Sequence, residues 1–146
     1  MQKLPKNDML YLLRMIEASE KIKVYSGEIT EPLVFFDLND QREFNACLTL
    51  LAQIGEQINK LSDDVKSENK NLDWEKIKDF RNRIVHDYTG IDKFITFEII
   101  RNDIPNLIYD LTVIVRKNLE SKIFDASEFE LSKTSQYLKH IRFDEI

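Results

Sequence analysis

The sequence predicts an all-α protein, an antiparallel helical bundle with four to five main helices. Two long segments carry apolar residues at alternating spacings of three and four, which places those residues on one face of a helix. Glycine and proline number only three each in 146 residues, so few positions would interrupt a helix. Signals for β-strands are scarce, and there is no internal repeat and no linker rich in glycine or serine. These observations favour helices packed on helices over a fold that contains a sheet.

The first predicted helix runs from about residue 7 or 8 to about residue 26. Asn7 or Asp8 would cap its start, and Gly27 would end it. The chain from there to residue 39 looks irregular, because it contains Pro32. We expect a short turn or helix there, with its apolar side chains tucked against the core. Those side chains are Leu33, Val34, Phe35 and Phe36.

The second predicted helix has the clearest apolar pattern, with successive spacings of three, four, three, four and three. Its stripe consists of Phe44, Cys47, Leu51, Ile54, Ile58 and Leu61. From Ser62 to Asn71 the sequence is polar and charged, and we expect the helix end and a loop. A third helix would then be capped by Asp73, with Lys76 where a capping box has Glu or Gln. Its predicted buried face consists of Trp74, Ile77, Phe80 and Ile84.

The fourth predicted helix repeats the alternating pattern but contains a proline. Its stripe consists of Phe97, Ile100, Ile104, Leu107, Leu111 and Ile114. Pro105 should kink this helix or begin a new one, because proline lacks a backbone donor. After about Leu119 the apolar pattern weakens, and we expect a loop and a short terminal helix. We therefore expect one domain, with a bundle over residues 1–118 and a helical extension of the same domain over 119–146.

The charge and cysteine content limit the possible functions. The net charge is -5, whereas a protein that coats nucleic acid carries a broad basic surface, so any RNA contact must be local or assembled from two chains. A single cysteine excludes an intrachain disulfide and a cysteine metal cluster. No apolar run is long enough to span a membrane, and the first residues lack the apolar segment of a signal peptide. We therefore expect a cytoplasmic protein that does not bind a membrane.

The segment from Asp79 to Asp92 concentrates the chemically active side chains. Arg81, Asn82, Arg83, His86, Asp87 and Tyr88 lie within eight residues. On a helix, Asn82 and His86 share a face, whereas Arg81 and His86 are separated by about 140°. Arg81 and His86 would meet only if Arg81 curls back or the helix end unwinds. Arg81 and Tyr88 share a face if the helix persists that far.

These residues fit phosphoryl transfer on RNA without a metal or another cofactor. His86 would act as general acid or base near neutral pH, and Asp87 would orient it. Arg81 would neutralise charge on the phosphate oxygens. The 2′-hydroxyl of the RNA would be the nucleophile, so no serine or cysteine is required. The alternative is a structural role, in which a histidine and two arginines cap a helix end or form solvated ion pairs.

Four residues outside this segment have structural interpretations. Gly55 would permit close packing of two helices, and Cys47 would lie in the core with the rest of its stripe. His140 lies in the tail among charged residues, and we expect it at the surface. Glu56 would either pair with Arg81 or Arg83 or lie on a solvated face.

The motif Arg81-x4-His86-x-Tyr88 resembles the Arg-x4-His-x-Tyr signature of HepT-like toxins in the HEPN superfamily. Other stretches that resemble this group are 53–56, 60–62, 90–92 and 102–107. The resemblance covers roughly residues 9 to 119, and the last stretch accounts for the proline in the fourth helix. By itself Arg-x4-His is a weak signature, and its flanks and the order of the helices make it specific.

The resemblance implies a homodimeric bundle that acts as a metal-independent endoribonuclease toxin. Two copies of the motif would face one another and form one RNA-cleaving cleft, with His86 from each chain. Arg81 and Arg83 from both chains would build a local positive patch. The resemblance also implies an MntA-like nucleotidyltransferase antitoxin that transfers AMP from ATP to Tyr88. The added bulk and negative charge would repel RNA from the cleft.

Two other functions stay open at this point. Related helical bundles resemble substrate-binding subunits of nucleotidyltransferases, which do not cleave RNA themselves. A purely structural helical dimer is the third reading, in which Tyr88 is an amphipathic aromatic that covers a helix end. The intact set of Arg81, His86 and Tyr88 favours the enzyme.

Overall fold

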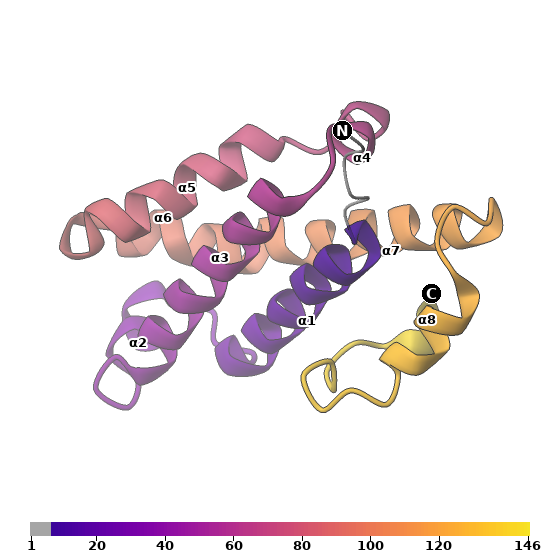
Figure 1. Cartoon of the computed structure of the whole chain (residues 1–146). Coiled ribbons are helices and arrows are strands. Elements are labelled where there is room, and N and C mark those ends of the chain that lie inside the picture. Colours follow the sequence, from indigo (N-terminus) through magenta and orange to yellow (C-terminus); the bar gives the residue numbers. More distant parts are fainter. Residues whose placement is uncertain (1–6) are drawn as a thin grey trace.

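Four long helices form the bundle in the computed structural model, which describes residues 7–146 (Figure 1). They are α1 (Asp8–Ser26), α3 (Arg42–Lys60), α5 (Trp74–His86) and α7 (Ile104–Glu120). The short α-helices are α2 (Pro32–Asp37), α4 (Asp63–Glu68), α6 (Lys93–Glu98) and α8 (Ala126–Ser132). The remaining helical segments are η1 (Tyr88–Gly90), the π-helical η2 (Ile99–Asp103) and η3 (Phe143–Glu145). Residues 7–146 contain no strand, which confirms the all-α class. The first six residues, where we looked for a signal peptide, lie outside the described range.

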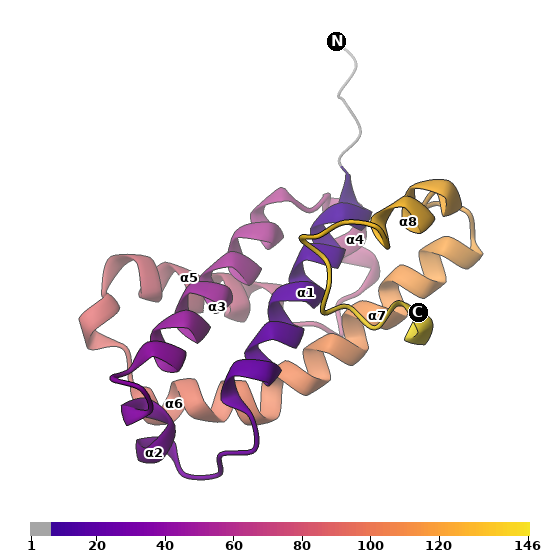
Figure 2. The ribbon, with the colours of Figure 1, turned by 90° about the horizontal axis from the view of Figure 1, so that it is seen from below.

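Helix α1 lies at the centre of the fold. It packs against α3 on one side and α7 on another, and α5 packs on the far side of α3 (Figures 1 and 2). Because several elements cover α1, it buries Glu17, Ser19 and Glu20 as well as apolar residues. This burial on several sides explains why the sequence of α1 has only a rough apolar stripe.

The predicted ends of α1 and the stripe of α3 are confirmed. The Asn7 side chain accepts a hydrogen bond from the Leu10 N–H at 3.2 Å, and Gly27 ends α1 with a φ of +55°. All six residues of the α3 stripe are buried. Among them is Cys47, and burial raises the pKa of its thiol to about 12. Cys47 is therefore a core residue with an unreactive thiol at neutral pH.

Two short segments differ from the sequence prediction. The polar stretch after α3 contains helix α4, whose start is capped by the Ser62 hydroxyl, which accepts from the Val65 N–H at 3.3 Å. We predicted a loop there because the stretch is polar and charged, and Val65 is the only side chain that α4 buries. In α2, Phe35 is fully buried, but Leu33 and Val34 are 50% and 56% exposed. The expectation that all its apolar side chains pack inward is therefore wrong, because a six-residue helix turns only one face to the core.

Pro105 begins a new helix, as one of the two sequence alternatives predicted. The chain forms α6 and the π-helical η2, and α7 then starts with Pro105 in its first turn, where no backbone donor is required. All six residues of the predicted fourth stripe are buried across this junction. No helix in residues 7–146 combines the length and the apolar character needed to cross a membrane.

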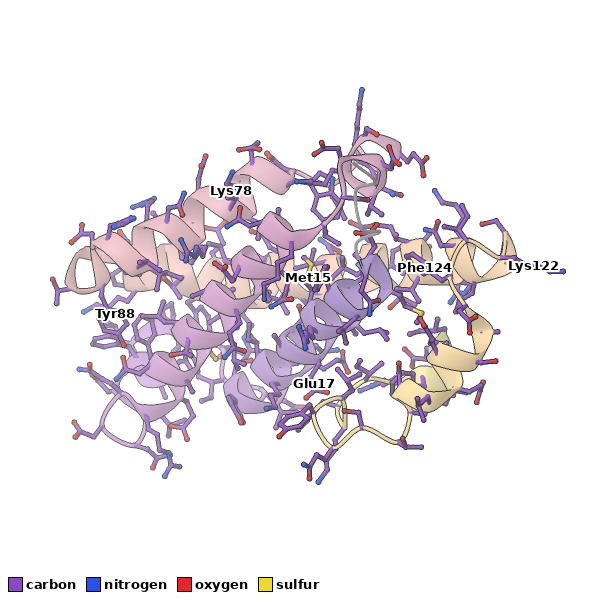
Figure 3. All side chains as sticks on the ribbon, in the orientation of Figure 1. Met15, Glu17, Lys78, Tyr88, Lys122 and Phe124 are labelled. Atoms are coloured by element: carbon purple, nitrogen blue, oxygen red, sulfur yellow. The ribbon has the colours of Figure 1, made fainter. Side chains whose placement is uncertain are left out.

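The last residues fold back over α1 (Figures 1 and 2). Phe124, Phe129, Leu138 and Ile141 are buried. The backbone N–H of His140 donates to Glu17 at 2.6 Å, and Nδ1 of its ring lies 2.7 Å from the second oxygen of that carboxylate. Figure 3 shows Glu17 on α1 beside the returning tail. His140, which we expected at the surface, is only partly exposed because Glu17 holds it against α1.

We expect His140→Ala to lower the free energy of unfolding by about 1–3 kcal/mol, because the buried Glu17 carboxylate loses a partner. Urea unfolding followed by circular dichroism measures the difference. Lys139→Ala is the matched control, since that neighbouring side chain is exposed. Equal stability of the two variants would show that the tail does not depend on this contact.

Candidate functional site

Helix α3 holds Arg81 in place from the neighbouring helix. Nη2 of Arg81 lies 2.9 Å from Oε2 of Glu56, and Nη1 donates to Oδ1 of Asn82 at 3.1 Å. The Arg81 side chain is 26% exposed, so the guanidinium is held in one place while part of it faces solvent. Glu56 was expected to pair with Arg81 or Arg83 or to lie on a solvated face, and in the structure it pairs with Arg81.

Gly55 allows α3 and α5 to approach at this point. A Cβ atom on Gly55 would lie 2.3 Å from Cβ of Arg81 and 3.3 Å from the backbone oxygen of Ile77. The first distance is shorter than any contact between real side-chain carbons, so a side chain here would push α5 away. The predicted role of Gly55 in close helix packing is confirmed.

His86 lies at the opposite end of the motif from Arg81 and is exposed. It is the last residue of α5, and the helix stays regular up to it, with Asp87 as the C-cap. Among the described residues, no hydrogen bond or ion pair joins His86 to Arg81, Asn82 or Asp87. Within one chain, neither of the conditions for bringing Arg81 and His86 together is therefore met.

Tyr88 lies beyond the end of α5 and contacts the same edge of α3 as Arg81. The α-helix ends at His86, and Tyr88 begins the 3-10 helix η1, so the helix does not persist far enough for the two residues to share a face. The Tyr88 hydroxyl instead donates to Oδ1 of Asn45 on α3 at 2.5 Å. Its side chain is 46% exposed at the end of the α3–α5 pair (Figure 3).

Asp87 packs against the turn that follows it and makes no hydrogen bond to His86. Its carboxylate lies over Gly90, where a Cβ atom would be 2.2 Å from Oδ2 of Asp87. The orienting role that we predicted for Asp87 is therefore not seen in a single chain.

Asn45 is a site residue that the sequence reasoning missed. Asn45 and Glu56 are eleven residues apart, about three helical turns, so they lie on the same edge of α3 beside its apolar stripe. From this edge Glu56 binds Arg81 and Asn45 binds Tyr88. The sequence signal that could have identified Asn45 is its spacing of eleven residues from Glu56, next to the buried stripe.

A groove of about 570 Å³ borders the other side of α5. Its floor is apolar and includes Ile77 and Phe80 of α5, which are only partly buried, contrary to our expectation for that helix face. The groove lies between α5 and η2 and α7, so Ile77 and Phe80 pack against the core on one side and line the groove on the other. Charged residues on its rim are Asp73, Glu75, Lys76, Asp79, Arg83, Asp103 and Asp110.

Residues 7–146 contain no group of three or more His, Cys, Asp or Glu side chains placed to hold a metal ion. Both histidines of the chain lie in this range, His86 at the end of α5 and His140 in the tail.

A helical bundle that carries an Arg–His–Tyr set at the end of one helix is the arrangement expected of the HEPN superfamily. The chain matches the family described as "Ribonuclease HepT-like" over residues 15–114. It therefore belongs to the HepT-like ribonuclease family, which confirms the resemblance inferred from the motif.

Three curated relatives have a ribonuclease in their names. One, from Methanocaldococcus jannaschii, is named for gamma-glutamylcyclotransferase and RNase, and is 27% identical over 93% of this chain and 61% of its own length. The chain thus spans less than two thirds of that relative. A second RNase of that organism is 27% identical over 77% of this chain and 92% of its own length. A ribonuclease HepT of Thermococcus cleftensis is 30% identical over 66% of this chain and 86% of its own length. No solved structure matches the chain.

We expect Gly55→Ala to lower the free energy of unfolding by about 1–3 kcal/mol, because the new methyl group overlaps Arg81. Alanine is the better helix former by about 1 kcal/mol, so a loss would report crowding against α5 and not a weaker helix. Urea unfolding measures the change, and Thr49→Ala on the exposed side of α3 is the control. A gain in stability would mean that α5 yields freely at this contact.

Proposed function

We propose that this protein is a metal-independent endoribonuclease toxin that a nucleotidyltransferase antitoxin neutralises by transferring AMP to Tyr88. The observation that carries the proposal is the placement of Arg81, His86 and Tyr88 on the last turns of α5 and the segment that follows it. Arg81 is fixed by Glu56, while His86 and Tyr88 stay exposed. Membership of a ribonuclease family supports RNA as the substrate.

The proposed reaction uses the 2′-hydroxyl of RNA as the nucleophile. A bond forms between this oxygen and the adjacent phosphorus, and the bond from phosphorus to the 5′-oxygen of the next nucleotide breaks. His86 accepts the proton of the 2′-hydroxyl or donates one to the leaving 5′-oxygen. Arg81 binds the phosphate oxygens as negative charge develops. Asn82 and Arg83 support this site, the first through its bond to Arg81 and the second as an additional cation.

We propose that the active form is a homodimer. The two proton transfers call for an acid and a base, and a second copy would supply a second His86. The groove beside α5 favours such pairing, because its floor is apolar and its rim carries both signs of charge. Lys76 of one chain would face Asp103 and Asp110 of the other across a two-fold axis. In the dimer, Arg81 and Arg83 of both chains would supply a local positive patch on an acidic protein.

Tyr88 is the proposed site of modification. The residue is 46% exposed, and its hydroxyl donates to the Asn45 amide oxygen. In the transfer, the tyrosine oxygen bonds to the α-phosphorus of ATP and pyrophosphate leaves. The attached AMP would place a negative phosphate and a bulky nucleoside at the end of α5, where they repel RNA. An MntA-like nucleotidyltransferase is the partner, and a cytoplasmic location provides both ATP and RNA.

A second candidate function is a non-catalytic substrate-binding subunit of a nucleotidyltransferase. It is favoured by the fact that Arg81 pairs with Glu56 and does not contact His86 within one chain. In that case Arg81 would stabilise the packing of α3 and α5, and His86 would be a surface residue.

Cleavage of single-stranded RNA by unmodified protein should persist in excess EDTA, and His86→Ala should lower its rate about 100-fold or more. Removing the imidazole deletes the proton-transfer group and leaves the fold intact, since His86 is exposed. The measurement is the rate at which a labelled RNA disappears on a denaturing gel. Val85→Ala, which truncates the 52% exposed neighbour, is the matched control and should cleave normally.

Light scattering should give twice the chain mass for all three proteins, so that a lost dimer is not mistaken for lost chemistry. Absence of cleavage by the parent protein, with Tyr88 shown to be unmodified by mass spectrometry, would move the assignment to the binding subunit. Cleavage that EDTA abolishes would reject the metal-independent mechanism.

Tyr88→Phe should make the toxin resistant to its antitoxin. Phenylalanine keeps the ring but has no oxygen to accept AMP, so cleavage should continue in the presence of the nucleotidyltransferase and ATP. The parent protein should gain the mass of one or more adenylyl groups under the same conditions and lose activity. Tyr25→Phe removes the hydroxyl of another partly exposed tyrosine and should behave like the parent. Modification at a residue other than Tyr88 would contradict the assignment.

A further inference from the structure

A second hollow, of about 480 Å³, lies beside Tyr88 and shares no lining residue with the groove at Phe80. Its lining includes Phe36, Phe44, Asn45, Tyr88, Lys93 and Phe94. We call it the Tyr88 hollow. It brings together α2, the start of α3, and the turn that leads from η1 into α6. Neither the proposed proton transfers nor the proposed dimer contact uses it.

The Tyr88 hollow has four aromatic residues, of which two pack on each other and two are exposed. Phe44 is buried, and Phe36 packs against it with ring centroids 4.8 Å apart. Tyr88 and Phe94 line the same hollow but are 46% and 52% exposed. Exposed aromatic rings in a concave site are the surfaces on which proteins stack unpaired nucleic-acid bases.

The polar groups of the hollow suit the edge of a base. Oδ1 of Asn45 accepts a hydrogen bond from the Tyr88 hydroxyl, and Nδ2 lies at the other end of the same amide. Nδ2 of Asn45 donates to no group within residues 7–146, so it is available to a ligand. Gln41 contributes a second amide to the lining. Amides offer a donor and an acceptor together, which matches the paired groups on a base edge.

Lys93 gives the hollow a cation that a phosphate could approach. Lys93 is the only cation in the lining, and its Nζ lies 4.5 Å from the centroid of the Phe36 ring. Asp92 is the only anion, and its Oδ1 already accepts the N–H groups of Phe94 and Ile95, at 2.8 and 3.0 Å. The carboxylate is therefore engaged in capping α6, while the ammonium has only a ring beneath it.

We propose that the Tyr88 hollow binds a nucleotide, with its base against Tyr88 and Phe94 and its phosphate at Lys93. This inference rests on the proposed function, because two nucleotides would come close to Tyr88. One is a nucleotide of the RNA next to the cleaved bond, and the other is the AMP attached to the Tyr88 oxygen. In the first case the hollow helps to position the substrate, and in the second it holds the modifying group in its blocking position.

The test compares nucleotide binding by the unmodified full chain and by two variants, Lys93→Gln and Phe94→Ala. One arm measures fluorescence anisotropy of a labelled 2′-O-methyl RNA octamer, which lacks the nucleophile and is not cleaved. The other arm titrates AMP and follows the Asn45 side-chain amide signals by NMR. Lys133→Gln is the matched control for charge, since Lys133 also lies over a phenylalanine ring, that of Phe129 at 5.2 Å. Tyr137→Ala, which removes a 78% exposed ring from the tail, is the control for the aromatic change.

We expect each hollow variant to weaken binding about fivefold or more, and the controls to match the parent. Weaker binding of the octamer identifies the RNA as the source of the nucleotide. Weaker binding of AMP with unchanged binding of the octamer identifies the attached AMP. Unchanged affinity for both ligands in both variants would overturn the proposal.

The outcome is separable from that of the proposed function, because neither arm requires cleavage. If the parent protein cleaves RNA in EDTA and the hollow variants bind nucleotides as the parent does, nucleotide binding in the hollow is rejected. The ribonuclease function is then retained. If the parent protein does not cleave RNA but the hollow variants lose nucleotide binding, the ribonuclease function is rejected. Nucleotide binding in the hollow is then retained. Circular dichroism of each variant establishes that the change lies in binding and not in folding.

Discussion

The close approach of α3 and α5 at Gly55 is the constraint on which the candidate site depends. Without a Cβ at this position, the stem of Arg81 lies directly on α3, and its guanidinium reaches Glu56 on the next residue. The ion pair is partly exposed, so its main contribution is orientation and not stability. One glycine thus sets both the distance between the two helices and the place of the arginine.

The same edge of α3 fixes the other end of the site. Asn45 binds the Tyr88 hydroxyl three turns away from Glu56, after α5 has already ended. Helix α3 is in turn supported by α1, which the tail covers through Glu17 and Glu20. The chain of support therefore runs from the tail through α1 and α3 to the motif. Residues far from the motif in sequence hold it in place.

The sequence was sufficient to predict the long helices and their buried faces, because their stripes repeat over several turns. It was insufficient where a helix buries only one or two side chains, as Val65 does in α4. The burial of Ile77 and Phe80 was overestimated, because periodicity indicates an inward face but not whether a neighbouring helix fills the space. The motif residues were identified from their types and the family resemblance. Glu56 was one of the expected partners of Arg81, whereas the contact of Asn45 with Tyr88 joins two helices and was not predicted.

The hydrogen bonds of Tyr88 and Arg81 have a consequence for how the motif can be transplanted. Both side chains take their positions from α3, and α5 contributes only the order in which they follow one another. A peptide or an unrelated scaffold that carried residues 81–88 on a stable helix would have the sequence of the motif but not its geometry. A transfer of the motif would have to include at least the helical hairpin from Arg42 to Gly90, because this segment contains both the edge of α3 and the residues that it positions.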